Sequence, residues 1–105
     1  MRGGTRFAAP SLVLQARRRA EGEDGKIARF GFTASKAIGG AVERNRARRR
    51  LKEAVRLTGA DHAVEGYDYV LIARSGTVQR RFTELIEDLK RALAKVHGPS
   101  PAKKR

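Results

Sequence analysis

The chain has 105 residues, enough for one compact domain, and its 24 lysines and arginines against 11 acidic residues give a formal charge of +13. This excess predicts a polyanionic partner, which is a nucleic acid, an anionic membrane or an acidic protein. Because the sequence has no cysteine and no apolar run near the roughly 20 residues of a membrane span, it excludes disulfides, thiolate chemistry and a transmembrane helix, and we expect a cytoplasmic protein.

Two strands are predicted in the first third of the chain, after a Gly-rich, basic start. Residues 11–17 form a short, β-prone run with an apolar middle. Residues 26–35 alternate in polarity, with Phe30 and Phe32 on one face and Arg29 on the other, so we expect a second strand antiparallel to the first. The charged, glycine-containing residues 17–26 predict the loop between them.

A helix is predicted from Ala41 to about Thr58, where the apolar period changes to 3.6 residues. Gly39 and Gly40 precede this segment, and Gly59 is a typical helix end. One narrow apolar stripe recurs along it at positions i, i+4, i+7, i+8 and i+11, namely Ala47, Leu51, Ala54, Val55 and Thr58.

The second half of the chain predicts one strand and one further helix. Residues 67–73 are apolar enough for a strand buried on both faces, and residues 74–79 are expected to turn the chain. An amphipathic helix is expected over residues 80–97, with a stripe of Phe82, Leu85, Ile86, Leu89, Leu93 and Val96. We therefore predict one α+β domain over residues 1–97, with three clear strands, and a disordered basic tail over residues 98–105.

The predicted first helix carries seven basic residues between positions 43 and 56, which are Arg44, Arg46, Arg48, Arg49, Arg50, Lys52 and Arg56. Like charges three and four residues apart repel one another on a helix, and solvated helix faces usually mix signs. Only Glu43 and Glu53 oppose these cations. Six of the seven are arginines, whose forked guanidinium group suits phosphate. The pattern favours nucleic acid over a plain solvated face.

Several alternatives remain open from the residues alone. A membrane-surface helix needs large apolar residues opposite its charges, whereas Ala47 and Ala54 are small. A DNA-binding regulator is not supported, because neither a helix-turn-helix nor a dimer interface is visible. Asn45 could read a base edge, cap a turn or brace Arg44. The aromatic rings of Phe30 and Phe32 could stack on bases or belong to the core.

No catalytic or metal-binding cluster is apparent. His62 and His97 are far apart in sequence, and no group of carboxylates has the spacing of a metal site. We therefore expect no catalytic residue and no bound metal in the protein, so that any chemistry is carried by another molecule.

The segment "FGFTASKAIGGAVERNRARRRLKEAVR", residues 30–56, resembles the protein component of bacterial ribonuclease P. The resemblance rests on a Ser-Lys turn, a glycine, an Ala-Val pair and an Arg-Asn core followed by a basic pair. The matching residues are Ser35, Lys36, Gly39, Ala41, Val42, Arg44, Asn45, Arg48, Arg49, Lys52 and Glu53. Residues 67–74, including Arg74, are similar to a later strand of the family, and residues 4–16 to its first strand region.

The resemblance implies a fold that the composition does not show. Members of the family have a four-stranded sheet with one very short strand. A left-handed β-α-β crossover passes through their Arg-rich helix, contrary to the general preference for right-handed crossovers.

The resemblance also implies a function. In this family an RNA subunit is the catalyst, and it removes the 5′ leader of precursor tRNA with bound magnesium, while the protein binds no cofactor. The Arg-rich helix contacts that RNA, and a cleft between the helix and the sheet holds the single-stranded leader. The implied RNA-binding residues are Ser35, Lys36, Arg44, Asn45, Arg46, Arg48, Arg49, Lys52, Arg56 and Arg74. The implied leader-cleft residues are Val13, Gln15, Phe30 and Phe32.

Two departures from the family pattern qualify this expectation. The family's basic first helix, which supplies an aromatic residue to the cleft, is apparently missing here, and Gln15 stands where an aromatic residue is often found. We expect weaker stacking on the leader and intact phosphate binding. The alternative is a non-catalytic RNA-binding protein of the ribosomal type, which composition alone does not separate from the first hypothesis.

Overall fold

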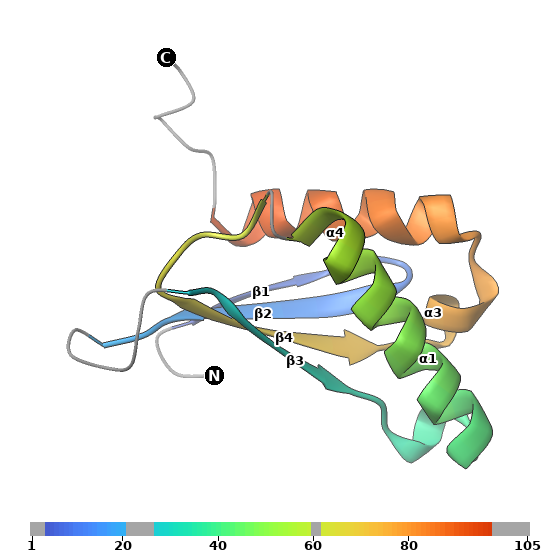
Figure 1. Cartoon of the computed structure of the whole chain (residues 1–105). Coiled ribbons are helices and arrows are strands. Elements are labelled where there is room, and N and C mark those ends of the chain that lie inside the picture. Colours follow the sequence, from blue (N-terminus) through green and yellow to red (C-terminus); the bar gives the residue numbers. More distant parts are fainter. Residues whose placement is uncertain (1–3, 21–26, 60–61, 98–105) are drawn as a thin grey trace.

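The computed structural model describes residues 4–20, 27–59 and 62–97, which form a four-stranded sheet with helices packed on one face (Figure 1). The strands are β1 (Gly4–Ala8), β2 (Leu12–Arg18), β3 (Arg29–Thr33) and β4 (Tyr67–Ala73). Their order in the sheet is β1-β2-β4-β3. The α+β class with four strands is confirmed, whereas the predicted tail over residues 98–105 lies outside the described residues.

The helical segments include the two predicted helices and two short ones that were not predicted. They are the short η1 (Lys36–Ile38), α1 (Ala41–Ala54) with a π-helical turn η2 (Val55–Gly59), α3 (Ser75–Gln79) and α4 (Phe82–Val96). The predicted helices over residues 41–58 and 80–97 are confirmed as α1 with η2 and as α4. Of the predicted stripes, Ala47, Leu51 and Ala54 of α1 are buried.

The turn predicted over residues 74–79 is wrong, because these residues form the short helix α3. A hydrogen bond to a distant residue and a close approach of two backbone segments hold this helix in place. The Thr77 hydroxyl donates to the Ser11 carbonyl (2.5 Å) and accepts from the Arg74 amide (2.9 Å). A Cβ atom on Gly76 would lie only 2.4 Å from the Pro10 carbonyl oxygen, so this position requires glycine. These distant partners leave no periodic signal in a segment of five residues.

The sheet pairing differs from the simplest expectation. Strands β2 and β3 run in opposite directions, as predicted, but β4 lies between them and pairs antiparallel with β2 and parallel with β3. The most apolar strand is thus central, with a neighbour on each side. The connection β3–α1–β4 is the left-handed crossover that the resemblance implies (Figure 1).

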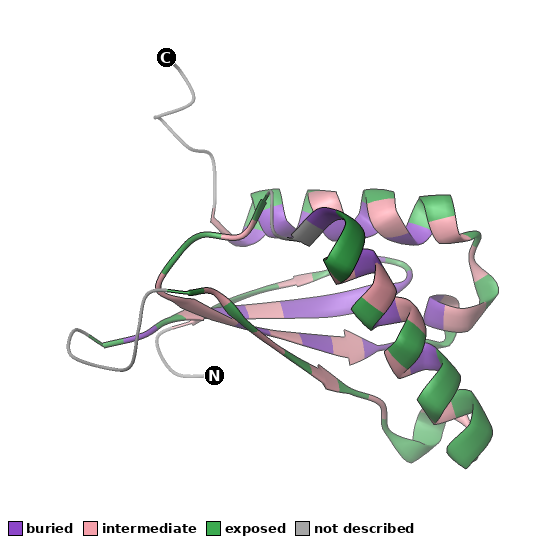
Figure 2. Ribbon diagram, viewed as in Figure 1, coloured by how far each residue is buried: buried purple, intermediate pink, exposed green. Residues whose placement is uncertain are grey.

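The core lies on the helix-covered face of the sheet (Figure 2). Alternate residues of β2 and β4 point into it and meet Leu51 of α1 and the stripe of α4. The fully buried leucines are Leu12, Leu14, Leu51, Leu71, Leu85, Leu89 and Leu93. The prediction that β4 is buried on both faces is wrong. Val70 and Ile72 point to the other face and are only partly buried, because no described helix covers that face.

One buried carboxylate joins the β1–β2 turn to α4. Asp88 is 1% exposed, and its Oδ2 atom accepts from the Ser11 hydroxyl (2.7 Å) and the Ser11 amide (3.2 Å). The Arg80 Nε atom lies 3.0 Å from the same oxygen. A charge is buried at this depth only when it is paired and hydrogen-bonded. The network therefore fixes where the α3–α4 corner meets the sheet.

Replacing Asp88 by alanine should lower the free energy of unfolding by about 3 kcal/mol, because the buried groups of Ser11 and the Arg80 guanidinium lose their partner. Urea denaturation followed by circular dichroism measures this change. Glu87→Ala, which removes an exposed carboxylate from the adjacent position, is the control and should shift stability by less than about 0.5 kcal/mol. Equal effects of the two substitutions would contradict the role of Asp88.

A second polar contact closes the end of α4. The Tyr69 hydroxyl accepts from the Val64 amide (2.8 Å) and lies 2.7 Å from His97 Nε2. When Nε2 carries no proton, it can accept a hydrogen bond from the Tyr69 hydroxyl. His97 also packs edge-on against Tyr67, with ring centroids 4.7 Å apart. Burial lowers the pKa of His97, so the fold favours its neutral form.

The stability contributed by neutral His97 should be complete above the unfolded-state pKa of about 6.5 and be lost as the pH falls through the lower folded-state pKa. The urea midpoint should therefore drop between pH 7 and pH 5. His97→Gln retains a polar partner for Tyr69 but does not titrate, so its midpoint should fall less over the same interval. A parallel pH profile for both proteins would refute the assignment.

Candidate nucleic-acid interface

The turn before α1 fixes where the basic helix begins. Gly39 has a φ of 142°, and a Cβ atom there would lie 3.0 Å from Cβ of Glu43, so glycine is required. The Glu43 carboxylate accepts from the Gly40 amide (3.1 Å) and so caps the first turn. Ser35 caps η1 by accepting from the Ala37 amide (3.3 Å), and Lys36 is exposed beside it. Ser35 and Lys36 thus lie directly before the basic helix, as the motif predicts.

Arg50 differs from the other cations of α1 because its side chain turns inward. Its Nε atom donates to the Thr77 carbonyl (2.7 Å) and its Nη2 atom to the Arg80 carbonyl (2.5 Å). Its guanidinium carbon lies 5.5 Å from the ring centroid of Phe82. This arginine is a structural clamp between α1 and the α3–α4 corner. The signal for it in the sequence is its place directly before Leu51, at the border of the apolar stripe.

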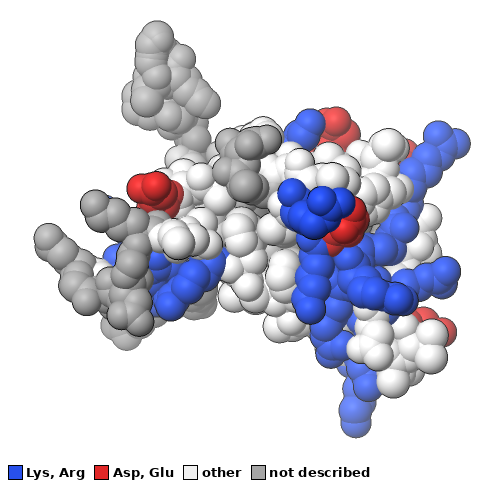
Figure 3. Space-filling model, viewed as in Figure 1, with Lys and Arg blue, Asp and Glu red and all other residues white. Residues whose placement is uncertain are grey.

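The remaining cations of α1 point away from the core and form the basic face of the helix (Figure 3). Arg44 donates to the Gly39 carbonyl (2.9 Å), and Arg48 donates to the Asn45 side chain (2.8 Å). Asn45 therefore braces Arg48, and not Arg44 as one of the three hypotheses held. Within the described part of the chain, the guanidinium groups of Arg46 and Arg49 make no hydrogen bond or ion pair.

Two further cations at the end of this helix have partners on the protein. Arg56 forms a two-point pair with Glu53, at 3.0 and 2.5 Å, and the hydrogen bond from Arg56 lowers the pKa of Glu53. Lys52 Nζ lies 6.0 Å from the ring centroid of Phe32 on β3. Arg46 and Arg49, the two arginines without a protein partner in the described part of the chain, therefore lie among cations that contacts within the protein hold in place.

Arg74 lies apart from this row. It precedes α3, and its Nη1 atom donates to the Ala9 carbonyl (3.0 Å), so it links the end of β4 to the β1–β2 turn. Its side chain remains exposed. The predicted RNA contact of Arg74 would therefore be made from the end of the sheet.

The four predicted leader-cleft residues do not share one surface. Val13 and Gln15 pair with Ile72 and Val70 and lie on the open face of the sheet, which no described helix covers. Phe30 and Phe32 point to the helix-covered face, where they pack against the core. Phe30 stacks on Tyr69 with centroids 5.1 Å apart. The four residues therefore do not line one surface: the β2 pair shares a face with Val70 and Ile72, and the β3 pair shares the opposite face with Tyr69 and Leu71.

The open face ends in a charged row. Asp68 lies beside Arg17 of β2 and Arg29 of β3 in the sheet register, and both arginines pair with its carboxylate, at 3.2 and 2.8 Å. Arg19, whose side chain is 3% exposed, approaches the same group at 2.6 Å. Hydrogen bonds from Arg29 and then Arg19 hold the pKa of Asp68 well below its usual range.

Two features that the described residues lack bear on other functions. Among residues 4–20, 27–59 and 62–97, no group of three or more histidine or acidic side chains is placed to hold a metal ion. No helix in the same ranges is long and apolar enough to cross a membrane.

This small α+β domain carries an Arg-rich helix that faces outward. Such an arrangement is typical of nucleic-acid-binding proteins, which contact phosphates through basic side chains. A sequence model of the Ribonuclease P family matches residues 1–97. The chain belongs to the ribonuclease P protein family, as the motif around Arg44 and Asn45 predicts. It is thus an accessory subunit of an endoribonuclease that acts in tRNA 5′ maturation, and its partner is the ribonuclease P RNA.

Curated relatives support this assignment. The ribonuclease P protein component of Ruegeria pomeroyi is 54% identical over 97 residues, which cover 91% of this chain and 77% of that protein. The component from Gluconacetobacter diazotrophicus is 49% identical over 92 residues, with 88% and 77% covered. Neither relative supports a ribosomal-type protein.

Solved structures share the fold. The RNase P protein of Staphylococcus aureus matches with a TM-score of 0.69 and 25% identity, over 89% of this chain and 83% of that one. That of Thermotoga maritima, in complex with a fluorophenyl thiourea, matches with a TM-score of 0.71 at 24% identity, over 89% and 86%. The second similarity concerns the fold alone.

The double substitution Arg48→Ala, Arg49→Ala should weaken binding to ribonuclease P RNA and reduce the slope of log affinity against log salt by about 0.7–0.9 for each phosphate that is no longer bound. The fold should survive, because neither side chain points into the core. Filter binding at several salt concentrations measures the slope. Lys95→Ala, which removes an exposed charge near the end of α4, is the matched control. An unchanged slope in the double variant would rule out phosphate binding by this face.

Proposed function

We propose that the protein uses two separate surfaces: the basic face of α1 docks on the ribonuclease P RNA, and the open face of the sheet receives the 5′ leader of precursor tRNA. One observation supports this division most directly. All described helices lie on one face of the sheet, so the opposite face presents an uncovered floor while α1 presents its charges elsewhere.

The basic face of α1 suits a folded RNA because several of its guanidinium groups are already positioned. Arg44 and Arg48 are held by the Gly39 carbonyl and the Asn45 side chain, and they lose less side-chain freedom on binding. Their partners are neutral oxygens, so both arginines keep a full positive charge for phosphate. Repulsion among the cations of α1 is relieved when a polyanion lies against them.

The open face suits a single strand. Its centre consists of the partly buried Val70 and Ile72 with Gln15 and the side-chain-free Gly31, arranged in neighbouring registers. Val13, which pairs with Ile72, is itself buried. This floor is partly apolar, and Asp68 with its arginine partners lies at one end of it. No aromatic side chain of the described strands β2, β3 and β4 points to this face, so leader binding should depend on phosphate contacts and the Gln15 amide more than on stacking.

The chemistry is proposed to belong to the RNA subunit. The protein supplies no catalytic residue in this proposal, and magnesium is bound and used by the RNA. The complex would act in the cytoplasm, where precursor tRNA is processed. Reconstitution tests the assignment: the protein added to a bacterial ribonuclease P RNA at low magnesium should restore cleavage of precursor tRNA, whereas the protein alone should cleave nothing.

Val70→Glu should separate the two surfaces. A carboxylate on the open face should repel leader phosphates by about 1 kcal/mol at 4 Å, which is about fivefold in affinity for precursor tRNA. Affinity for the RNA subunit and for mature tRNA should not change. Thr83→Glu adds the same charge to the exposed side of α4 and serves as the control.

The measurement is the ratio of precursor to mature tRNA affinity for the reconstituted complexes. A ratio that stays the same in Val70→Glu would show that the leader does not lie on the open face. If the original protein, with α1 intact, did not bind the ribonuclease P RNA at all, the proposed role of α1 would be contradicted instead.

A further inference from the structure

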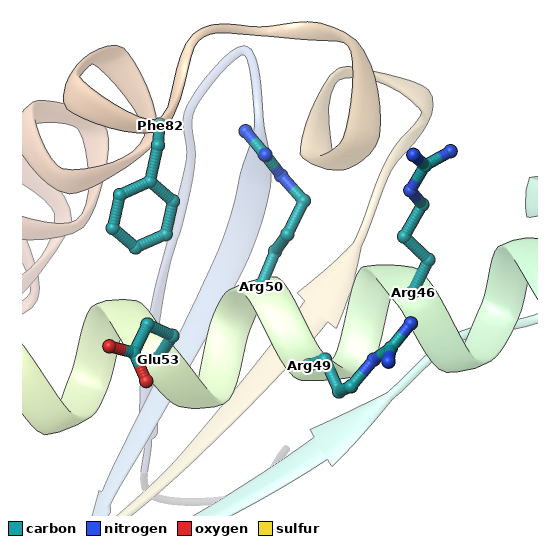
Figure 4. Close-up of a pocket in the computed structure, with 5 residues that line it drawn as sticks. All are labelled: Arg46, Arg49, Arg50, Glu53 and Phe82. Carbon is teal, nitrogen blue, oxygen red and sulfur yellow. The ribbon is translucent and has the colours of Figure 1, made fainter.

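A pocket of about 300 Å³ lies between α1 and the start of α4, on the side of α1 turned away from the sheet (Figure 4). Its lining residues are Arg46, Arg49, Arg50, Glu53 and Phe82. The sequence gives no sign that Phe82 lies beside the basic helix. Its place in the apolar stripe of α4 predicts a core residue instead. The structure leaves the ring only partly buried.

Two planar groups, the Arg50 guanidinium and the Phe82 ring, form one wall of this pocket, and the fold already fixes the position of Arg50. Arg50 lies over the Phe82 ring at 5.5 Å, and two carbonyl oxygens of the α3–α4 corner fix its guanidinium group. A guanidinium plane and an aromatic ring are the two protein surfaces on which unpaired bases stack. Because the orientation of Arg50 is set by the fold, little side-chain entropy is lost when a base covers this surface.

The rim of the pocket carries an ordered pattern of charge. Arg46 and Arg49 are exposed on one side, and in the described part of the chain neither has a protein partner. Glu53 lies on the other side, where Arg56 holds its carboxylate. Phosphates are attracted to the arginines and repelled from Glu53, whose oxygens can accept hydrogen bonds from the N–H groups of a base.

We infer that this pocket receives one unpaired nucleotide of the ribonuclease P RNA. The base stacks on Phe82 and Arg50 with its N–H edge toward Glu53, and the flanking phosphates lie on Arg46 and Arg49. The inference rests on the proposed docking of α1. It adds to that docking an interaction that does not depend on charge and that only a single-stranded, unstacked position of the RNA can make.

Phe82→Leu tests the stacking directly, because it keeps an apolar side chain and removes the flat ring. Its affinity for ribonuclease P RNA should fall about tenfold. The slope of log affinity against log salt should stay unchanged, since no charge is removed. Phe82→Tyr retains the ring and should bind like the original protein. Arg49→Ala should lower both the affinity and the slope.

Phe7→Leu is the matched control for weakened packing. Phe7 is also a partly buried phenylalanine packed against the core, but it lies on β1 outside the pocket. Thermal unfolding places the two leucine variants on one stability scale. If Phe7→Leu lowers RNA affinity as much as Phe82→Leu does, the effect is one of folding and the inference is overturned.

Chemical probing of the RNA gives an independent readout. At least one unpaired nucleotide should be protected from base-modifying reagents by the original protein and by Phe82→Tyr, and become reactive with Phe82→Leu. Full affinity and full protection with Phe82→Leu would overturn the pocket. If Arg48→Ala, Arg49→Ala still weakens binding in that case, the docking of α1 stands; if neither variant weakens binding, the docking fails as well.

Discussion

The clamp formed by Arg50 determines what the rest of α1 can do. Its guanidinium group spans the Thr77 and Arg80 carbonyls and so sets the helix against the α3–α4 corner. A carboxylate partner would have fixed the helix equally well, but it would have neutralised one of the charges on it. Carbonyl oxygens hold the arginine and leave the positive field of α1 intact. This arrangement lets one side chain stabilise the fold and still contribute to the attraction of a polyanion.

The clamp in turn depends on a corner that other polar groups hold. Asp88 binds Ser11 of the β1–β2 turn and Arg80 at the end of α3, while Thr77 of α3 donates a hydrogen bond to Ser11. A continuous set of contacts thus runs from the sheet through the corner to the basic helix. Buried polar networks of this kind are costly if any member is unpaired, and when they are satisfied they specify one geometry. The basic face of α1 is therefore fixed relative to the open face of the sheet.

The local elements were predictable, because each carries its own period, but their arrangement was not. The stripe around Leu51 and the alternation through Phe30 and Phe32 need only neighbouring residues to be recognised. The order of strands depends on pairing across long stretches of chain, since β4 inserts between β2 and β3. The helix α3 was not predicted for the same reason, because its partners Pro10 and Ser11 lie more than sixty residues earlier in the sequence. In the candidate site, charge and the family motif pointed to α1 as the candidate RNA-binding helix, but not to the inward turn of Arg50 to the Thr77 carbonyl.

Charge alone gives a protein affinity for any RNA, so recognition of one RNA needs groups whose positions are fixed. In this protein the fixed groups are unevenly distributed. Arg44, Arg48 and Arg50 are held by oxygens of the protein, whereas Arg46 and Arg49 remain uncommitted beside the Phe82 pocket. In the proposed complex, Arg44, Arg48 and Arg50 would present phosphate-binding groups at set distances along α1, and Arg46 and Arg49 would adjust to the local path of a strand. An RNA whose backbone matches the first set and offers an unpaired base to the second would satisfy both, and a regular duplex would satisfy only the first.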